Sequence, residues 1–162
     1  HRTHTSWSPD GSEIVYVGRG DGFFGLRVMT ADGKKVRDLT RRTRDDGKGS
    51  DQHPLWSPDS RKIAFLRRKD GESPRFKLFV IDRDGKNEIP LPAELGAAED
   101  MASWSPDSSR LAYAFSPLDA VRGGGDPRRG IFSWDLAGGK VERLTQDLSG
   151  MPAWQPKPAE IK

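Results

Sequence analysis

Two histidines at equivalent places in the chain could hold a metal ion together. His4 and His53 each lie three residues before a tryptophan, and Asp51 or Asp100 could add a carboxylate ligand if the two imidazoles converge on one cavity. Zinc takes at least three protein ligands, so two imidazoles alone make a poor site. The default interpretation is therefore a pair of exposed polar side chains, with no metal ion.

Other motifs that would carry out chemistry are absent from the sequence. The chain contains no cysteine, so it has no disulfide, thiolate metal ligand or thiol nucleophile. Neither a Gly-x-Ser-x-Gly nucleophile motif nor a Gly-x-x-x-x-Gly-Lys-Ser/Thr phosphate-binding loop is present. The triple glycine at residues 123–125 is interpreted as a flexible insertion. We therefore predict no catalytic residue and no cofactor.

Clusters of arginine are candidates for binding. Arg67 and Arg68 form one cluster, and Arg122 lies near a second at Arg128 and Arg129. All are expected in variable loops, with acidic neighbours and without interleaved aromatic residues that could stack on bases. With 27 basic and 24 acidic residues the surface is mixed, so solvated loop charge is favoured over nucleic-acid binding.

A glycine-rich segment at residues 18–25 contains Phe23 and Phe24. In a loop these two rings would be exposed apolar anchors suited to contact with a protein partner. The alternative, that they begin a strand and pack between sheets, stays open. Loops held on a rigid frame commonly carry binding residues, so this segment and the arginine loops are the candidate binding loops.

A repeat supplies the elements that must position these residues. The tetrapeptide Trp-Ser-Pro-Asp occurs three times, a degraded Trp-Gln-Pro copy follows, and the four tryptophans are 49, 48 and 50 residues apart. Such a fixed period indicates a repeat architecture. Met101 and Met151 stand where the first two repeats have histidine, which weighs against a metal site. The residues of the repeated motif are Trp7, Pro9, Asp10, Trp56, Pro58, Asp59, Trp104, Pro106, Asp107 and Trp154.

Each repeat predicts four short antiparallel strands. One strand ends at the tryptophan, a β-rich strand follows the Ser-Pro-Asp turn, and a third leads to an Asp-Gly or Gly-Gly turn before a short closing strand. Four-stranded units at a period in the forties are typical of β-propeller blades. The tryptophan is expected to pack between neighbouring sheets. An aspartate that recurs in every turn is expected to accept local backbone hydrogen bonds, not to catalyse a reaction.

These motifs resemble the TolB-like propellers built from PD40 repeats, a relative of the WD40 group. The resemblance rests on the Trp-Ser-Pro-Asp turn, the Ile-Ala-Phe strand at residues 63–65, the strand ending in Asp82 before an Asp-Gly turn, and the Leu-Thr pairs at residues 39–40 and 144–145. It implies an all-β, six-bladed propeller, of which this chain supplies three four-stranded blades and one extra inner strand. The expected blades are residues 3–49, 50–98 and 99–149, and residues 150–157 begin a further one.

The resemblance also implies a function. It predicts a non-catalytic scaffold that binds a protein or peptide partner in the bacterial cell envelope, in the periplasm or outside the cell. Two alternatives stay open: a propeller enzyme similar to the oligogalacturonate lyases, with His4 and His53 at a channel metal site, and the sensor propeller of a larger regulatory protein. The remaining blades are expected from a segment before His1 or, less favourably, from a second copy of the chain. No apolar run approaches the ~20 residues needed to cross a membrane.

Overall fold

The computed structural model describes residues 4–20, 23–40, 42–43, 50–68, 76–92, 102–115, 130–145 and 154. Its strands form three antiparallel sheets in which strand order follows the chain. The first sheet contains β1 (Thr5–Trp7), β2 (Glu13–Gly20), β3 (Phe23–Thr30) and β4 (Val36–Asp38), and β5 (Arg42–Thr43) pairs with the start of β3. The second contains β6 (Ser50–Trp56), β7 (Lys62–Arg68), β8 (Lys77–Asp82) and β9 (Ile89–Pro90). The third contains β10 (Ser103–Trp104), β11 (Arg110–Phe115), β12 (Gly130–Asp135) and β13 (Val141–Arg143).

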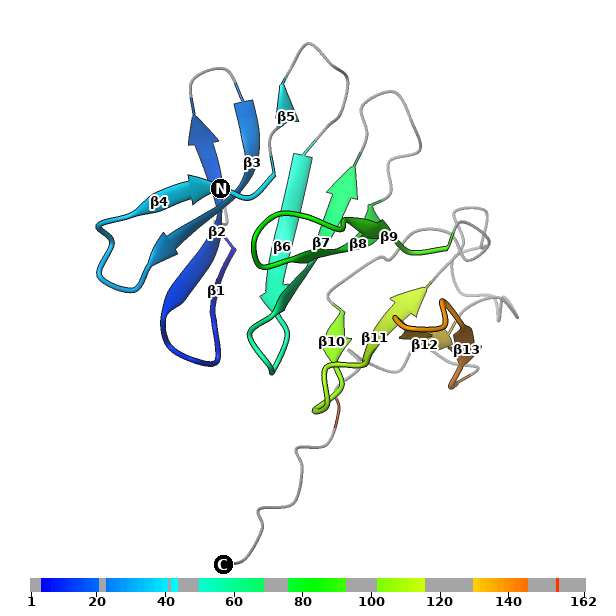
Figure 1. Cartoon of the computed structure of the whole chain (residues 1–162). Helices are drawn as coiled ribbons and strands as arrows, with labels where there is room; N and C mark the ends of the chain where they lie inside the picture. Colours follow the sequence, from blue (N-terminus) through cyan, green and yellow to red (C-terminus); the bar gives the residue numbers. More distant parts are fainter. Residues whose placement is uncertain are drawn as a thin grey trace, which may run out of the picture.

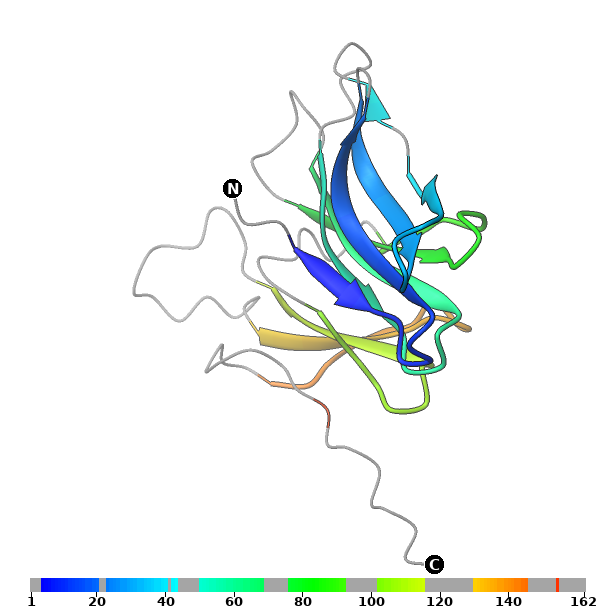
Figure 2. The same cartoon turned by 90° about the vertical axis from the view of Figure 1, so that its left-hand side faces the viewer.

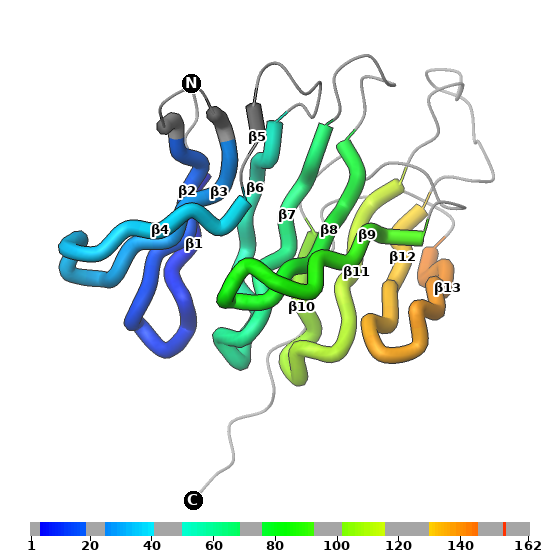
Figure 3. The backbone as a smooth tube through the Cα atoms, turned by 45° about the horizontal axis from the view of Figure 1, so that its top comes forward, coloured from blue at the N-terminus to red at the C-terminus, as the bar shows by residue number. Residues whose placement is uncertain are grey.

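These sheets are blade 1 (β1–β5), blade 2 (β6–β9) and blade 3 (β10–β13), and they lie side by side in chain order (Figures 1 and 3). Figure 2, a quarter turn away, shows that successive blades stack face to face. We call the first strand of each blade, β1, β6 or β10, its inner strand. The prediction of an all-β fold built from four-stranded antiparallel units is confirmed, with β5 as an unpredicted addition. In the part of the chain that the structure describes, no helix could span a lipid bilayer.

Hydrogen bonds inside the Ser-Pro-Asp turn explain why its aspartate recurs. Asp10 Oδ1 accepts a bond from the Ser8 hydroxyl at 2.6 Å and one from the Ser12 N–H at 2.9 Å. Asp59 and Asp107 accept equivalent bonds in their own turns, at 2.6 to 3.1 Å. Each carboxylate therefore stabilises its own turn, which is a structural role.

The turn aspartates make the stability of the fold sensitive to acid. Hydrogen bonds from Ser105 and Ser109 lower the pKa of Asp107 from 3.8 to about 2. A carboxylate with a lowered pKa stabilises the folded state above pH 3.8, and this contribution is lost as the pH falls toward 2. We expect the free energy of unfolding, measured by urea titration, to decrease across this window and to decrease less steeply in Asp107→Asn. Equal slopes in the two proteins would contradict this prediction.

The repeat tryptophans pack against the preceding blade. Trp56 is 4% exposed in a core cluster with aliphatic side chains of blade 1, and Trp104 is 6% exposed in a second cluster with side chains of blade 2. The indole N–H groups of Trp104 and Trp154 donate to main-chain oxygens of the preceding inner strand, at 3.1 and 2.9 Å. Trp7 lies on the face of blade 1 opposite blade 2 and is 57% exposed. The same residue type is therefore core or surface according to whether a sheet covers it.

A serine in the motif ties consecutive blades together. The N–H of Asp10 donates to the Ser60 hydroxyl of blade 2, and the N–H of Asp59 donates to the Ser108 hydroxyl of blade 3, both at 3.0 Å. These serines have φ of +59° and +62°, and Gly11 has +72° at the equivalent position of blade 1. A left-handed φ favours glycine, so the hydroxyl bond to the neighbouring blade offsets the strain of placing serine there.

Strands reach further into the candidate loops than the sequence predicts. Arg67 and Arg68 are the last residues of β7, not loop residues, because the β7 ladder continues through them. Phe23 and Phe24 begin β3, as the second alternative expects of the backbone, and the expected packing of their rings between blades lies outside the described part of the structure. Three candidate arginines also lie outside the described residues: Arg122, Arg128 and Arg129.

Candidate functional site

A partly enclosed cavity lies beside the inner strands of the blades. Its volume is about 170 Å³, and it is lined by residues of β1, β6, β7 and β8 and of the segment just before β10. Most of its wall is apolar and includes Leu55, Phe65, Leu66, Leu78 and Ala102. The polar side chains among its lining residues are His4, Thr5, Ser6 and His53.

The two candidate histidines meet at this cavity. The ring centroids of His4 and His53 are 3.8 Å apart and the ring planes are at 77°, so the edge of one ring faces the other. His53 lies in an irregularity of β6 between Gln52 and Leu55 and has φ of +53°. A β-bulge adds one residue to a strand and redirects its side chains, and a left-handed φ is unfavourable for residues other than glycine. The backbone of β6 therefore holds the His53 ring against His4.

A shared metal ion does not fit this arrangement. Zinc–nitrogen bonds at a tetrahedral angle would hold the ring centroids roughly 5 Å apart, farther than the observed 3.8 Å. The Asp51 carboxylate already binds Arg67. Within the described ranges, no group of three potential ligands is found, and Asp100 lies outside them. Among the described residues, the structure brings His4 and His53 together without a third ligand for a metal ion.

Arg67 is the centre of a buried ion cluster. Its side chain is 6% exposed, and that of Asp51 is 0% exposed. Its guanidinium donates to both carboxylate oxygens of Asp51 at 2.6 and 3.0 Å and to those of Glu88 at 2.5 and 2.8 Å. The guanidinium also lies over the rings of Phe65 and Phe79, 4.9 and 4.4 Å from their centroids. Burial acts to lower the pKa of Arg67, but the hydrogen bonds to Glu88 and Asp51 outweigh it and raise the pKa. Arg67 is therefore a buried strand residue, and the prediction of a solvated loop charge is wrong for it.

The bulge in β6 also decides which residues form this ion pair. On one side of the bulge Trp56 pairs with Ile63, and on the other side Asp51 pairs with Arg67. If the pairing register of Trp56 with Ile63 continued along β6 without a bulge, Asp51 would lie opposite Arg68 and not Arg67. One extra residue in β6 therefore both turns a histidine toward the cavity and joins Asp51 to Arg67.

Solved structures show the same arrangement of blades, whereas no protein-family model and no curated protein matches the sequence. TolB from Agrobacterium tumefaciens is 23% identical, with a TM-score of 0.64, and the match covers 90% of this chain and 50% of that one. Oligogalacturonate lyase from Vibrio parahaemolyticus is 18% identical, with a TM-score of 0.64 and coverage of 93% and 41%. TolB from Acinetobacter baumannii is 21% identical, with a TM-score of 0.60 and coverage of 87% and 31%.

The fold is a partial six-bladed β-propeller. The resemblance to TolB-like propellers is confirmed at the level of structure. At these low identities the likeness shows the fold alone, and this chain spans half or less of the length of the compared structures.

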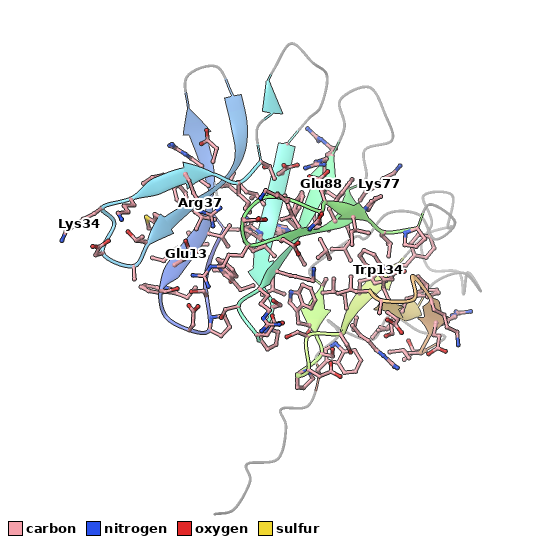
Figure 4. All side chains as sticks on the ribbon, in the orientation of Figure 1. Glu13, Lys34, Arg37, Lys77, Glu88 and Trp134 are labelled. Carbon is pink, nitrogen blue, oxygen red and sulfur yellow. The ribbon has the colours of Figure 1, made fainter. Side chains whose placement is uncertain are left out.

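Contacts between blades 1 and 2 of this propeller include a set that the sequence did not predict. Arg83, in the turn after β8, donates to Glu13 and Asp10 at 2.8 Å and to the Ser12 hydroxyl at 2.7 Å. The bond to Asp10 is the largest cause of the raised pKa of Arg83. Arg37 donates to the main-chain oxygen of Arg83 at 2.6 Å and lies beside Glu13 (Figure 4). The equivalent positions of the other repeats hold no arginine, so repetition offered no signal for this network.

The two candidate arginines of β7 stand apart from the histidines. Arg68 is exposed at the end of the strand, with its guanidinium 6.0 Å from the centroid of the Phe76 ring. Neither Arg67 nor Arg68 lines the cavity. Of the candidate residues that the structure describes with side chains, His4 and His53 come together at the cavity, and Asp51 and Arg67 come together in the buried ion cluster.

Proposed function

We propose that this propeller is a non-catalytic scaffold whose inner-strand cavity binds an apolar side chain of a protein or peptide partner. The cavity carries the proposal: it is partly enclosed, mostly apolar and about 170 Å³ in volume. An apolar cavity of about 150 Å³ is large enough to hold benzene. Concave apolar sites with a few polar groups are the usual form of ligand sites. This one would therefore accept a single branched or aromatic side chain.

The frame around the cavity supports a binding role. His4 directly precedes the inner strand β1 and His53 lies in the inner strand β6 of the next blade, and the two blades are joined by the buried Trp56. Further blades would complete the wall opposite the cavity, and the exposed indole of Trp7 offers a face for one of them. The resemblance of the repeats to TolB-like proteins favours the cell envelope as the location. We do not carry over the activity of the compared lyase, because the described residues around the two histidines supply no third metal ligand and the rings are too close to share an ion.

Selection from a peptide library displayed on phage tests this proposal. We expect the protein to enrich peptides that share one bulky apolar residue. Ala102→Leu would fill the cavity and weaken binding of a selected peptide at least about tenfold, equivalent to 1.4 kcal/mol. Affinity is measured by fluorescence anisotropy, and thermal unfolding verifies that the variant is folded.

Two further variants sharpen the comparison. Ala31→Leu adds the same volume in an exposed turn of blade 1 and should leave affinity unchanged. His53→Asn keeps a residue that tolerates a left-handed φ while changing the cavity surface, so it should weaken binding without loss of fold. Enrichment of no peptide, or equal affinity of all the variants, would refute the proposed function.

A further inference from the structure

Within the described residues, blades 1 and 3 lie at the two ends of the row, and each has one face that no other blade covers (Figure 3). The ladder of blade 1 places four apolar side chains in one row across its free face: Trp7, Ile14, Met29 and Val36. Trp7 is 57% exposed and Val36 is 45% exposed. The free face of blade 1 is therefore apolar, like the faces that are buried between blades.

Leu144 shows that the far face of blade 3 is also open. It directly follows the last strand of its blade, as Leu39 and Leu91 do in blades 1 and 2. The N–H of each leucine donates to a main-chain oxygen of the third strand of its own blade, so the three positions are equivalent. Leu39 and Leu91 are 7% and 5% exposed, whereas Leu144 is 53% exposed. The difference arises because a following blade covers the first two.

The exposed tryptophan and the exposed leucine are the two halves of a contact that the structure already contains twice. Leu39 of blade 1 lies in one core cluster with Trp56 of blade 2, and Leu91 of blade 2 lies in another with Trp104 of blade 3. A third contact of this kind would join the leucine of blade 3 to the tryptophan of blade 1. These residues lie at opposite ends of the row, so a second copy of the chain is the partner that fits both.

Trp154 already occupies the place on blade 3 that the tryptophan of another blade would take. Its indole N–H donates to the main-chain oxygen of Ser103 at 2.9 Å, as that of Trp104 donates to Leu55 at 3.1 Å. Ser103 and Leu55 each directly precede the tryptophan of their own repeat, so the two acceptors are equivalent. Two indoles cannot fill one place in a packed contact, so Trp154 competes with Trp7 of another copy.

We propose that the free faces of blades 1 and 3 bind each other between two copies of this chain, and that Trp154 opposes this association from within each copy. In the dimer, Trp7 of one copy replaces Trp154 on blade 3 of the other, and Leu144 becomes buried. The contact is head-to-tail and forms twice. It closes into a ring because three blades are half of a six-bladed propeller.

Gly11 makes this contact weaker than the contacts between blades of one chain. In blades 2 and 3 the hydroxyls of Ser60 and Ser108 accept a hydrogen bond from the turn of the preceding blade. Gly11, at the equivalent position of blade 1, has no hydroxyl. Serine is accommodated at this left-handed position in the other two blades, and a Cβ added at Gly11 would meet no atom within 4 Å. Gly11→Ser would therefore supply the missing acceptor.

Sedimentation velocity over a range of protein concentrations tests this inference. We expect the unaltered protein to be monomeric and Trp154→Ala to form a dimer as the concentration rises. In Trp154→Ala, the added change Trp7→Ala or Leu144→Lys should weaken the dimer at least about tenfold, because each removes an apolar group that the contact buries. Adding Gly11→Ser should tighten it about fivefold, the effect of one neutral hydrogen bond.

Three controls keep the result independent of the fold of Trp154→Ala. Thermal unfolding verifies that each variant is folded, and Gly11→Ser in the otherwise unaltered chain should raise the association constant by the same factor with Trp154 in place. Ile89→Ala changes an exposed apolar residue of the middle blade and should leave the dimer of Trp154→Ala unchanged.

Four outcomes contradict the proposal. A Trp154→Ala protein that stays monomeric, or a dimer that Trp7→Ala does not weaken, would show that these faces do not bind each other. Assemblies that grow beyond the dimer would exclude a closed ring. An unaltered protein that dimerises as tightly as Trp154→Ala would exclude the role of Trp154.

Discussion

Replacement of Arg67 by methionine should lower the free energy of unfolding by about 3–5 kcal/mol, the cost of breaking a buried ion pair by removing one partner. Asp51 is fully buried and receives two hydrogen bonds from this guanidinium. Methionine fills a similar volume, so the loss comes from the charge and its hydrogen bonds more than from packing. Urea unfolding followed by tryptophan fluorescence measures the change.

Two variants separate the buried charge from other effects of replacing Arg67. Lys140→Met removes a cation from an ion pair with Glu142 whose side chains are 70% and 46% exposed, and it should cost only about 0–1 kcal/mol. The double variant Arg67→Met with Asp51→Leu should recover much of the lost stability, because the fully buried carboxylate is removed as well and Glu88, which stays, is 32% exposed. The explanation fails if Arg67→Met costs no more than Lys140→Met.

Removal of the indole at Trp104 should have a similarly large effect, about 3–5 kcal/mol for Trp104→Ala. The side chain is 6% exposed in the core between blades 2 and 3, and its N–H donates to the main-chain oxygen of Leu55 at 3.1 Å. Alanine would leave a cavity between two sheets and an unpaired carbonyl. Calorimetry and urea unfolding would both report this loss.

Trp7→Ala is the matched control, because Trp7 has the same place in the motif but is 57% exposed. It should cost about 1 kcal/mol or less, as expected for a surface substitution. Losses of equal size in Trp7→Ala and Trp104→Ala would show that the tryptophan acts within its own turn and not between blades.

Much of the fold was predictable because its signals are local. A tryptophan, a proline and an aspartate at fixed places in each turn recur at an almost constant interval, and each Asp-Gly turn lies within a few residues of the strands that it joins. Turn geometry depends on neighbouring residues, so a single repeat carries the information for one blade. Trp56 and Trp104 are buried between blades as this reasoning predicts.

The candidate site was predictable only in part. The repeat predicts equivalent positions for His4 and His53, and the structure brings their rings into contact, with His4 directly before β1 and His53 in β6. The same reasoning placed Arg67 in a solvated loop, although it lies in β7 and is buried. A cluster of basic residues looks alike in a loop and at the end of a strand, because local composition does not report which side chains face a partner strand.

The amino-acid sequence by itself determined the blade, its turns and the order of the blades along the chain. The tertiary structure decided the pairing of Asp51 with Arg67, the contact of Arg83 with blade 1 and the cavity beside His53. The pairing and the position of His53 depend on one extra residue in β6, and a shift of one residue in register changes every pair beyond it. Pro54, which cannot donate to the ladder, lies within that shift, but the residues that the shift brings together are charges and rings that meet only after the sheets have formed.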